Sequence, residues 1–354
     1  MSIISLGVGP YITASIIMQL LTLVVPSLKE MYHEEGEIGR QKFTQYSRYL
    51  TVVFAFIQAF GILALLRTQN VFITATNTEL LQNIVILMAG SFLTLWMADL
   101  ISEFGIGNGT SMIIFAGIVA SIPGHIGQAL FTYEPSQMLW YGGILLIIIA
   151  VVWLTVTINE AERRVAVTYT RQMQAGGYIT SGADTHIPLK LTLAGVMPLI
   201  FASSLLTLPQ IFSQLALLAK SSVLTNIGNA LTAFQNNHLW YGIVYFLLVF
   251  IFTYFYTATV FDADAMAERL QKSGGFIPGV RPGTATAELV GQILSRVTFF
   301  GALFLAVIAI LPLILQNSTG NTTFAIGGTS VLIAVSVVID LIKKLGAQAS
   351  MREY

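Results

Sequence analysis

Long runs of apolar residues alternate with short polar connections along the whole chain. A run of about 20 apolar residues is long enough to cross a bilayer as a helix. The pattern predicts nine such spans, at residues 8–27, 46–66, 80–99, 111–131, 138–158, 189–209, 239–260, 296–315 and 324–342. Strands of a membrane barrel would be about half as long and would alternate apolar with polar residues. The predicted fold class is therefore an all-α polytopic membrane protein.

The positions of the positive charges predict the orientation of these spans. Only 10% of the residues are charged, and the mean hydropathy is +0.77. Of the 17 Lys and Arg residues, all but Arg67 and Lys220 lie in or beside one set of alternating connections. Because Lys and Arg are enriched in cytoplasmic connections, these connections and the C-terminus are predicted to be cytoplasmic.

Two short phrases each occur twice in the chain. GVGPYITASII at 7–17 returns as GVMPLIFASSL at 195–205, and NGTSMIIFAGIV at 108–119 returns as GGTSVLIAVSVV at 327–338. The two spans of each pair are predicted to cross the membrane in opposite directions. This pattern is typical of an inverted repeat, with a pathway between the halves near the membrane midplane. We expect the halves to be residues 1–135 and 136–354.

The sequence offers little for catalysis or for metal binding. It has no cysteine, and its four histidines fall in the connections. No Walker-type phosphate-binding motif and no arrangement suited to intramembrane proteolysis is visible, so no catalytic residue, metal or cofactor is predicted. An inverted-repeat secondary transporter is the alternative function; it would need a polar or charged ion site at mid-depth, which the spans do not show. An intramembrane protease fits less well.

Several long motifs occur in one order along the chain, among them LGVGPYITASIIMQLLTLVVPSLKE, EFGIGNGTSMIIFAGIVASIP, ERRVAVTY, HIPLKLTLAGVMPLIFASS and KSGGFIPGVRPGTATAE. In these motifs the chain resembles the bacterial and plastid-type SecY family, the channel subunit of the Sec protein translocase. The resemblance implies a clamshell of two inverted halves that passes unfolded polypeptides and is not an enzyme.

The resemblance also implies that six aliphatic side chains close the pore at its waist. Carried over residue by residue, this ring is Ile12, Ile16, Ile114, Ile118, Ile200 and Ile333. The two repeats had already paired Ile12 with Ile200 and Ile114 with Ile333. Aliphatic side chains suit a polypeptide substrate because they form no specific bonds and exclude water from an empty pore.

Members of the family also open sideways, between the helices that correspond here to 8–27 and 46–66 and those at 189–209 and 239–260. Polar residues occur along that seam: Gln19, Thr22, Gln58, Ser203, Ser204 and Thr207. Interhelical hydrogen bonds contribute only about 0.6 to 2 kcal/mol each. We therefore expect a seam that can part and release a hydrophobic signal sequence into the lipid.

Two long connections, near 159–188 and 261–295, are rich in Arg, Lys, Gly and Pro. The resemblance implies that they dock the ribosome and the SecA ATPase, through the basic residues Arg163, Arg164, Arg281 and Lys272. It also implies SecE and SecG as partner subunits. The expected location is the inner cell membrane or, in a plastid, the thylakoid membrane.

The start of the chain departs from the family pattern. Members of the family have ten spans, and a first helix and a small plug helix precede the GxxPYIxAS segment. Here that segment begins at Gly7. We expect that the sequence is a fragment or that its start is misassigned. An engineered truncation and a split gene are the less favoured alternatives.

Overall fold

The computed structural model describes residues 2–33, 36–68, 77–131, 138–169, 184–218, 222–319 and 328–352. The chain divides into two compact units. The first unit consists of Met1–Glu134, Ile200–Tyr245 and Val337–Tyr354, and the second of Pro135–Leu199 and Phe246–Ser336. The inverted halves 1–135 and 136–354 stay a prediction.

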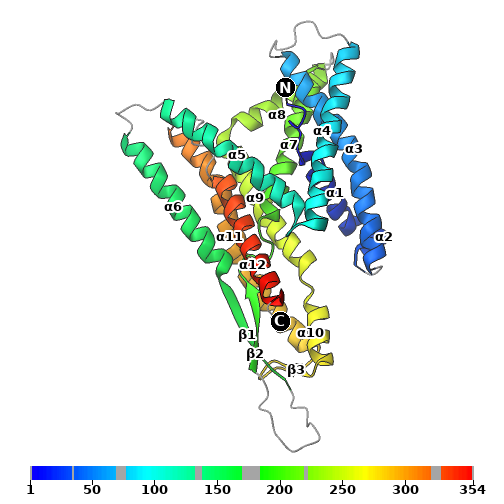
Figure 1. Cartoon of the computed structure of the whole chain (residues 1–354), viewed down its shortest axis with the longest axis vertical. Helices are drawn as coiled ribbons and strands as arrows, with labels where there is room; N and C mark the ends of the chain where they lie inside the picture. The colour runs from blue at the N-terminus through cyan, green and yellow to red at the C-terminus, as the bar shows by residue number, and fades with distance from the viewer. Residues whose placement is uncertain are drawn as a thin grey trace, which may run out of the picture. The chain divides into compact units, whose positions relative to one another are not determined.

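The first unit is a bundle of helices packed side by side (Figure 1). It contains α1 (Gly9–Val24), α2 (Pro26–His33), α3 (Gly36–Thr68), α4 (Asn77–Phe104), α5 (Gly109–Phe131), α8 (Ser222–Asn236), most of α7 (Met197–Leu218), and parts of α9 (His238–Val260) and α12 (Gly328–Arg352). Helix α3 packs against both α1 and α4. The core between them is built from Leu6, Ala59, Leu63, Ile84 and Leu87.

The second unit combines helices with a small sheet. It contains α6 (Met138–Glu160), β1 (Glu162–Tyr169), β2 (Asp184–Lys190), α10 (Ala263–Lys272), β3 (Gly275–Phe276), α11 (Thr284–Thr319), and the remaining parts of α7, α9 and α12. The strand order is β2-β1-β3, with both pairings antiparallel. The sheet therefore joins the two long connections predicted to dock partners, because β1 and β2 come from one and β3 from the other.

Alternation of side chains explains why residues 162–169 form a strand. Val165 and Val167 are buried, whereas the alternating Arg164 and Ala166 are exposed. Successive side chains of a strand point to opposite faces, so this segment has one apolar face. That face packs with Leu189, Leu270, Ile277 and Val290 into one hydrophobic cluster. The sheet and α10 thus form a folded unit with its own core.

The predicted start of the sixth span was wrong. The helix begins at Met197 and not at residue 189, because residues 184–190 pair with β1 and residues 191–196 form turns. Gly195 has φ +57°, a left-handed conformation that no helix interior uses. The apolar run LTLAGV is therefore a buried connection between a strand and a helix.

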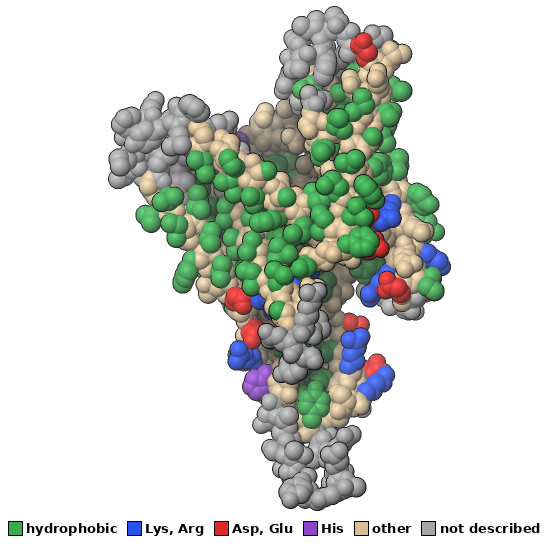
Figure 2. All heavy atoms as spheres, in the orientation of Figure 1, with side chains coloured by type: hydrophobic (Ala, Val, Ile, Leu, Met, Phe, Trp, Pro, Cys, Tyr) green, Lys and Arg blue, Asp and Glu red, His purple; other side chains and the backbone are tan. Residues whose placement is uncertain are grey.

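Several helices of the described residues are suited to a membrane. Four stretches are long and apolar enough to span one, at Gly36–Ala64, Thr78–Phe104, His238–Lys272 and Thr284–Gln316, and α1 with α2 makes a fifth if this bent pair is one span. Apolar helical stretches of 16 residues occur at Gly109–Gly124 and Leu145–Glu160. Hydrophobic side chains cover the visible faces of the long helices (Figure 2). The number of nine spans stays a prediction.

Candidate functional site

The two copies of the first repeated phrase have the same backbone conformation. Gly7 has φ +51° and Gly195 has φ +57°. The amide of Gly7 donates to the carbonyl of Ile4 (2.9 Å), and that of Gly195 donates to the carbonyl of Thr192 (3.0 Å). In each copy a helix then begins two residues later, with Pro as its second residue. The sequence repeat is thus also a repeat of local structure.

A close contact is repeated in the same way. A Cβ atom on Gly90 of α4 would overlap the carbonyl oxygen of Ile3, and a Cβ atom on Gly301 of α11 would overlap that of Leu191. Ile3 and Leu191 occupy equivalent places in the two copies of the phrase, each four residues before its left-handed glycine. In each copy, the backbone just before the repeated phrase therefore packs directly against a glycine of a neighbouring helix.

The six predicted ring residues are partly or fully buried. Ile16 and Ile200 have 2% and 7% of their surface exposed, and Ile12, Ile114, Ile118 and Ile333 are half-buried. The first five lie in one unit and Ile333 in the other. Their convergence on one constriction stays a prediction.

Four of the six predicted gate residues line one cavity. This cavity, of about 390 Å³, lies in the first unit between α1, α3 and α7, and its walls include Gln58, Ser203, Ser204 and Thr207. Sequence reasoning missed three further polar side chains in the same walls, which are Thr13, Gln210 and Gln214. On α7, the polar residues Ser203, Thr207, Gln210 and Gln214 are spaced by four, three and four positions, which was a usable signal because such residues share one helix face.

The other two gate residues, Gln19 and Thr22, are not among the residues that line this cavity. The Thr22 hydroxyl donates to the backbone carbonyl of Gln19 (2.6 Å). The side-chain oxygen Oε1 of Gln19 is buried and has no hydrogen-bond partner among the described residues. The structure therefore separates these two from the four that share the cavity.

Hydrogen bonds at the cavity are mostly local. The hydroxyls of Ser203 and Thr207 donate to carbonyls of their own helix, at 2.9 and 2.6 Å. Gln58 Nε2 of α3 donates to Thr13 Oγ1 of α1 at 3.4 Å, a long and weak bond. Few bonds would therefore have to break for α3 and α7 to separate.

The predicted docking residues lie on the sheet, on α10 and in the turn before α11. Arg163 and Arg164 are exposed on β1, and Arg281 is exposed in the turn between β3 and α11. Arg164 Nε lies 2.9 Å from a carboxylate oxygen of Glu162, and Lys272 Nζ lies 2.7 Å from one of Glu268. Arg163 and Arg281 have no acidic partner among the described residues, so their charges are the more available ones.

The backbone of the turn that carries Arg281 is constrained by two prolines and by one hydrogen bond. Pro278 and Pro282 restrict their own φ angles, while Gly279 and Gly283 adopt φ +85° and +105°. The carbonyl of Arg281 accepts a 3.0 Å hydrogen bond from the hydroxyl of Thr286. This backbone presents the Arg281 side chain from a defined position.

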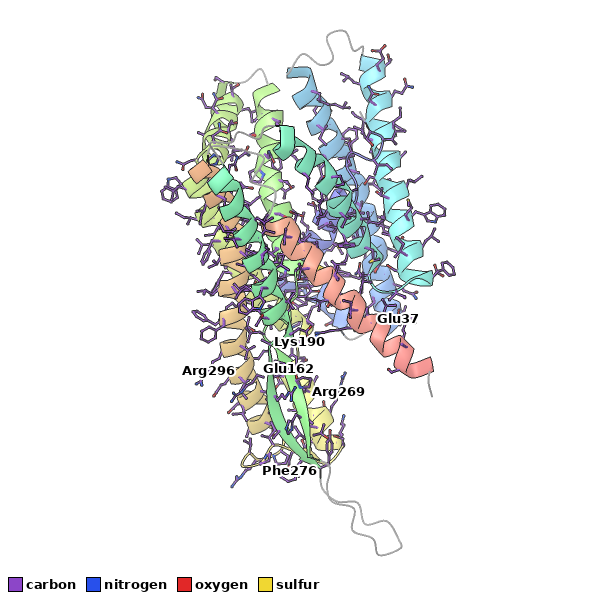
Figure 3. The ribbon with its side chains drawn as sticks, turned by 60° about the vertical axis from the view of Figure 1, so that its left-hand side comes forward. Glu37, Glu162, Lys190, Arg269, Phe276 and Arg296 are labelled. Carbon is purple, nitrogen blue, oxygen red and sulfur yellow. The ribbon has the colours of Figure 1, made fainter. Side chains whose placement is uncertain are left out.

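Figure 3 shows the extent of the sheet. Glu162 and Lys190 lie opposite each other at one end, and Phe276 of β3 lies at the other end beside Thr168. Arg269 projects from α10 near the same sheet. In Figure 2, charged side chains gather over the sheet and α10, in contrast to the apolar surfaces of the long helices. We call the sheet with α10 and the turn 277–283 the docking sheet.

Comparison with known proteins gives the family. The family model described as SecY matches residues 2–342. This chain belongs to the SecY family. The protein translocase subunit SecY of Thermotoga maritima is 41% identical to it, over 100% of this chain and 80% of the relative. The SecY of Aquifex aeolicus is 39% identical, over 100% of this chain and 82% of the relative.

Solved structures of SecY-type channels share the fold. A SecY structure solved in connection with its plug domain and membrane seal has a TM-score of 0.69 and 20% identity, over 98% of this chain and 83% of that one. The structure of a protein-conducting channel has a TM-score of 0.68 and 19% identity, over 98% and 82%. The predicted family and the all-α membrane fold class are confirmed.

The function predicted from the sequence is confirmed as well. The chain is a SecY-type protein translocase subunit, a component of a protein-conducting channel, which is a non-enzymatic role. The alternative of a secondary transporter is therefore set aside.

Proposed function

We propose that this chain passes unfolded secretory polypeptides through a pore closed by the six-isoleucine ring and releases hydrophobic segments sideways where α3 meets α7. The observation that supports the lateral exit is the cavity between α1, α3 and α7, whose mainly apolar walls carry several polar side chains. The described residues of its walls carry amide and hydroxyl groups but no charged side chain. Such groups can bond a passing segment weakly and then let it go, because polar bonds between membrane helices are individually weak.

Beside the cavity, α3 and α7 touch closely. A Cβ atom on Gly61 of α3 would lie 3.2 Å from Cγ2 of Ile211 on α7. The absence of a side chain at Gly61 lets the two helices approach without a large interlocking surface. Since the contact at Gly61 is made by the apolar side chain of Ile211, with the Gln214 amide oxygen 3.9 Å from the same Cβ position, it suits a seam that opens and closes.

The chain offers a direct test of this exit, because it contains no native cysteine. A Cβ atom on Gly61 would lie 3.9 Å from the Cβ atom of Ile211, within the roughly 3.5–4.5 Å range of disulfides. We expect the pair Gly61→Cys and Ile211→Cys to form a disulfide on oxidation. In membrane vesicles, the locked channel should stop inserting a hydrophobic segment into lipid, and reduction should restore insertion.

Each single cysteine variant serves as the control, since oxidation should leave its insertion unchanged. The crosslink is followed by the change in mobility of the protease-nicked chain on a denaturing gel. Insertion at the wild-type rate by a fully crosslinked channel would show that the hydrophobic segment does not leave between α3 and α7.

The proposal extends to partners and location. We propose SecE and SecG as partner subunits, and the SecA ATPase or a ribosome as the source of the pushing force, docked on the basic residues Arg163, Arg164, Arg281 and Lys272. A ribosome complex is known for the structurally similar canine Sec61 channel (TM-score 0.63, 19% identity). The distribution of Lys and Arg supports a cytoplasmic C-terminus, in an inner cell membrane or a thylakoid membrane.

A further inference from the structure

One polar side chain connects three segments of the second unit. Asn159, near the end of α6, donates from Nδ2 to Oγ of Ser336 on α12 at 2.8 Å. Its Oδ1 accepts a 2.8 Å hydrogen bond from the Thr192 hydroxyl, in the turn before α7. Thr192 and Ser336 are almost fully buried. We call these three residues the Asn159 clamp.

Two further contacts hold the same turn. The amide of Leu191 donates to the carbonyl of Ala161 at 3.0 Å, which continues the β1–β2 pairing towards α6. The carbonyl of Leu191 lies against Gly301 of α11. The turn is therefore fixed to α6, to the sheet and to α11.

The inverted repeat does not require this clamp. The first copy of the repeat has Ile4 at the place of Thr192 and Gly117 at the place of Ser336. Neither residue has a side chain that can form a hydrogen bond. The backbone contacts at Gly90 and Gly301 are present in both copies, whereas the clamp is present only in the second. Its side-chain bonds are thus an addition to the shared fold.

The clamp lies between the docking sheet and two helices that carry ring residues. Strand β1 begins at Glu162, three residues after Asn159. On α12, Ser336 lies one turn after Ile333, and Thr192 lies in the turn that leads directly into α7 and Ile200. A displacement of β1 can reach α7 through β2 and the turn that follows it, and the two bonds of Asn159 join this turn to α6 and α12.

We propose that Asn159 is a positioning residue that couples the docking sheet to α7 and α12, so that force applied by a partner moves the ring residues of these helices. Without the carboxamide, α12 loses its side-chain bond to α6, and the turn before α7 keeps its backbone contacts at Leu191 but loses its bond to Asn159, so the sheet and the two helices are coupled more loosely. The coupling to force rests on the proposed docking role of the sheet.

The first test measures the coupling itself, without a partner. Two cysteines, at the exposed Ala166 of β1 and the exposed Val338 of α12, carry spin labels in the assembled channel in lipid nanodiscs. We expect one narrow distance distribution for the otherwise wild-type channel and a clearly broader one for Asn159→Ala. The variants Thr192→Val and Ser336→Ala each remove one of the two hydrogen bonds of Asn159, and each should broaden the distance distribution less than Asn159→Ala.

A control variant is available on the same helix. Thr157 is exposed, and its hydroxyl bonds only the Trp153 carbonyl of its own helix (2.8 Å). Thr157→Ala should give the wild-type distribution. If Asn159→Ala does not fold, Thr192→Val and Ser336→Ala decide the test. An unchanged, narrow distribution in the variants that fold would overturn the proposal.

The second test measures function. Motor-driven translocation into vesicles should be slower in Asn159→Ala by roughly threefold to tenfold, as expected for two interhelical hydrogen bonds, while binding of the motor stays within about twofold. If translocation by Asn159→Ala equals that of wild type, the coupling to force is wrong. If the proposed docking sheet is wrong, the distance distribution still broadens in Asn159→Ala, but Arg281→Glu leaves motor binding intact.

Discussion

Single glycines decide how closely the backbone of this SecY-family chain can approach its helices. Gly90 and Gly301 each lie under a backbone carbonyl, whereas Gly291, on the same helix as Gly301, faces open space. A methyl group at the first two positions must displace a backbone, which cannot rotate away as a side chain can. These two glycines are therefore required by packing and not by their φ angles.

We expect Gly301→Ala to destabilise the protein by about 1–3 kcal/mol, the usual cost of overpacking a core. Gly291→Ala is the matched control and should be neutral or slightly stabilising, since Ala favours helix by up to about 1 kcal/mol over Gly. Thermal unfolding of both variants in detergent checks this. Equal unfolding temperatures for Gly301→Ala and wild type would mean that the Leu191 segment can move away at no cost.

At the scale of elements, the docking sheet is the part that sequence reasoning described least well. The sequence analysis treated residues 159–188 and 261–295 as long connections between apolar spans and predicted no strand in them. Their alternating pattern, as in ERRVAVTY, was a usable strand signal, since Val165 and Val167 point into a core that Arg164 and Ala166 avoid. What the sequence could not show is that β3 pairs with β1, because that contact joins segments about a hundred residues apart.

Arg281 can have one of two roles. It either contacts a docking partner or only helps to keep its connection on the cytoplasmic side of the membrane, and a charge reversal distinguishes the two. Arg281→Glu replaces a charge-assisted contact with repulsion, a loss of about 2 kcal/mol or more if an anionic partner surface binds there. Motor-driven export into vesicles should then fall sharply, while channel abundance and loop orientation stay normal. Arg281→Lys should be intermediate, because the charge remains but the planar guanidinium is lost.

Arg269→Glu is the control for this prediction, because Arg269 of α10 is not one of the four predicted docking residues and the change alters the charge of the same connection by the same amount. We expect it to export at nearly the wild-type rate. Equal losses in the two variants would indicate that export responds to the net charge of the connection and not to the place of Arg281.

At the scale of the whole molecule, the sequence predicted the class of protein but only part of its sites. Long apolar runs and the two repeated phrases were sufficient for the membrane fold, because burial in lipid leaves a strong sequence pattern. The gate cavity was found through Gln58 and the α7 hydroxyls, but Gln210 and Gln214 were missed. The Asn159 clamp was not predictable, since its partners lie 33 and 177 residues away in the chain.

The ring prediction belongs to this scale because it needs residues from both units. Replacing Ile114 and Ile118 by Gly should wet the pore and raise the ion conductance of reconstituted bilayers, since dewetting by aliphatic side chains blocks ions. Val119→Gly with Ile126→Gly is the matched control, as both residues are exposed on the same helix and the cost to the helix is equal. If the conductance rises no more than in this control, Ile114 and Ile118 do not seal the pore against ions.

The division of the chain into two interwoven units has a consequence for biosynthesis. The first unit takes in residues from both ends of the sequence, and α7 and α12 each begin in one unit and end in the other. While the chain is being made, neither unit can complete its packing until α12 has emerged, because α12 contributes residues to both. Protein domains usually fold one after another as they are synthesised; here, the two units must finish together.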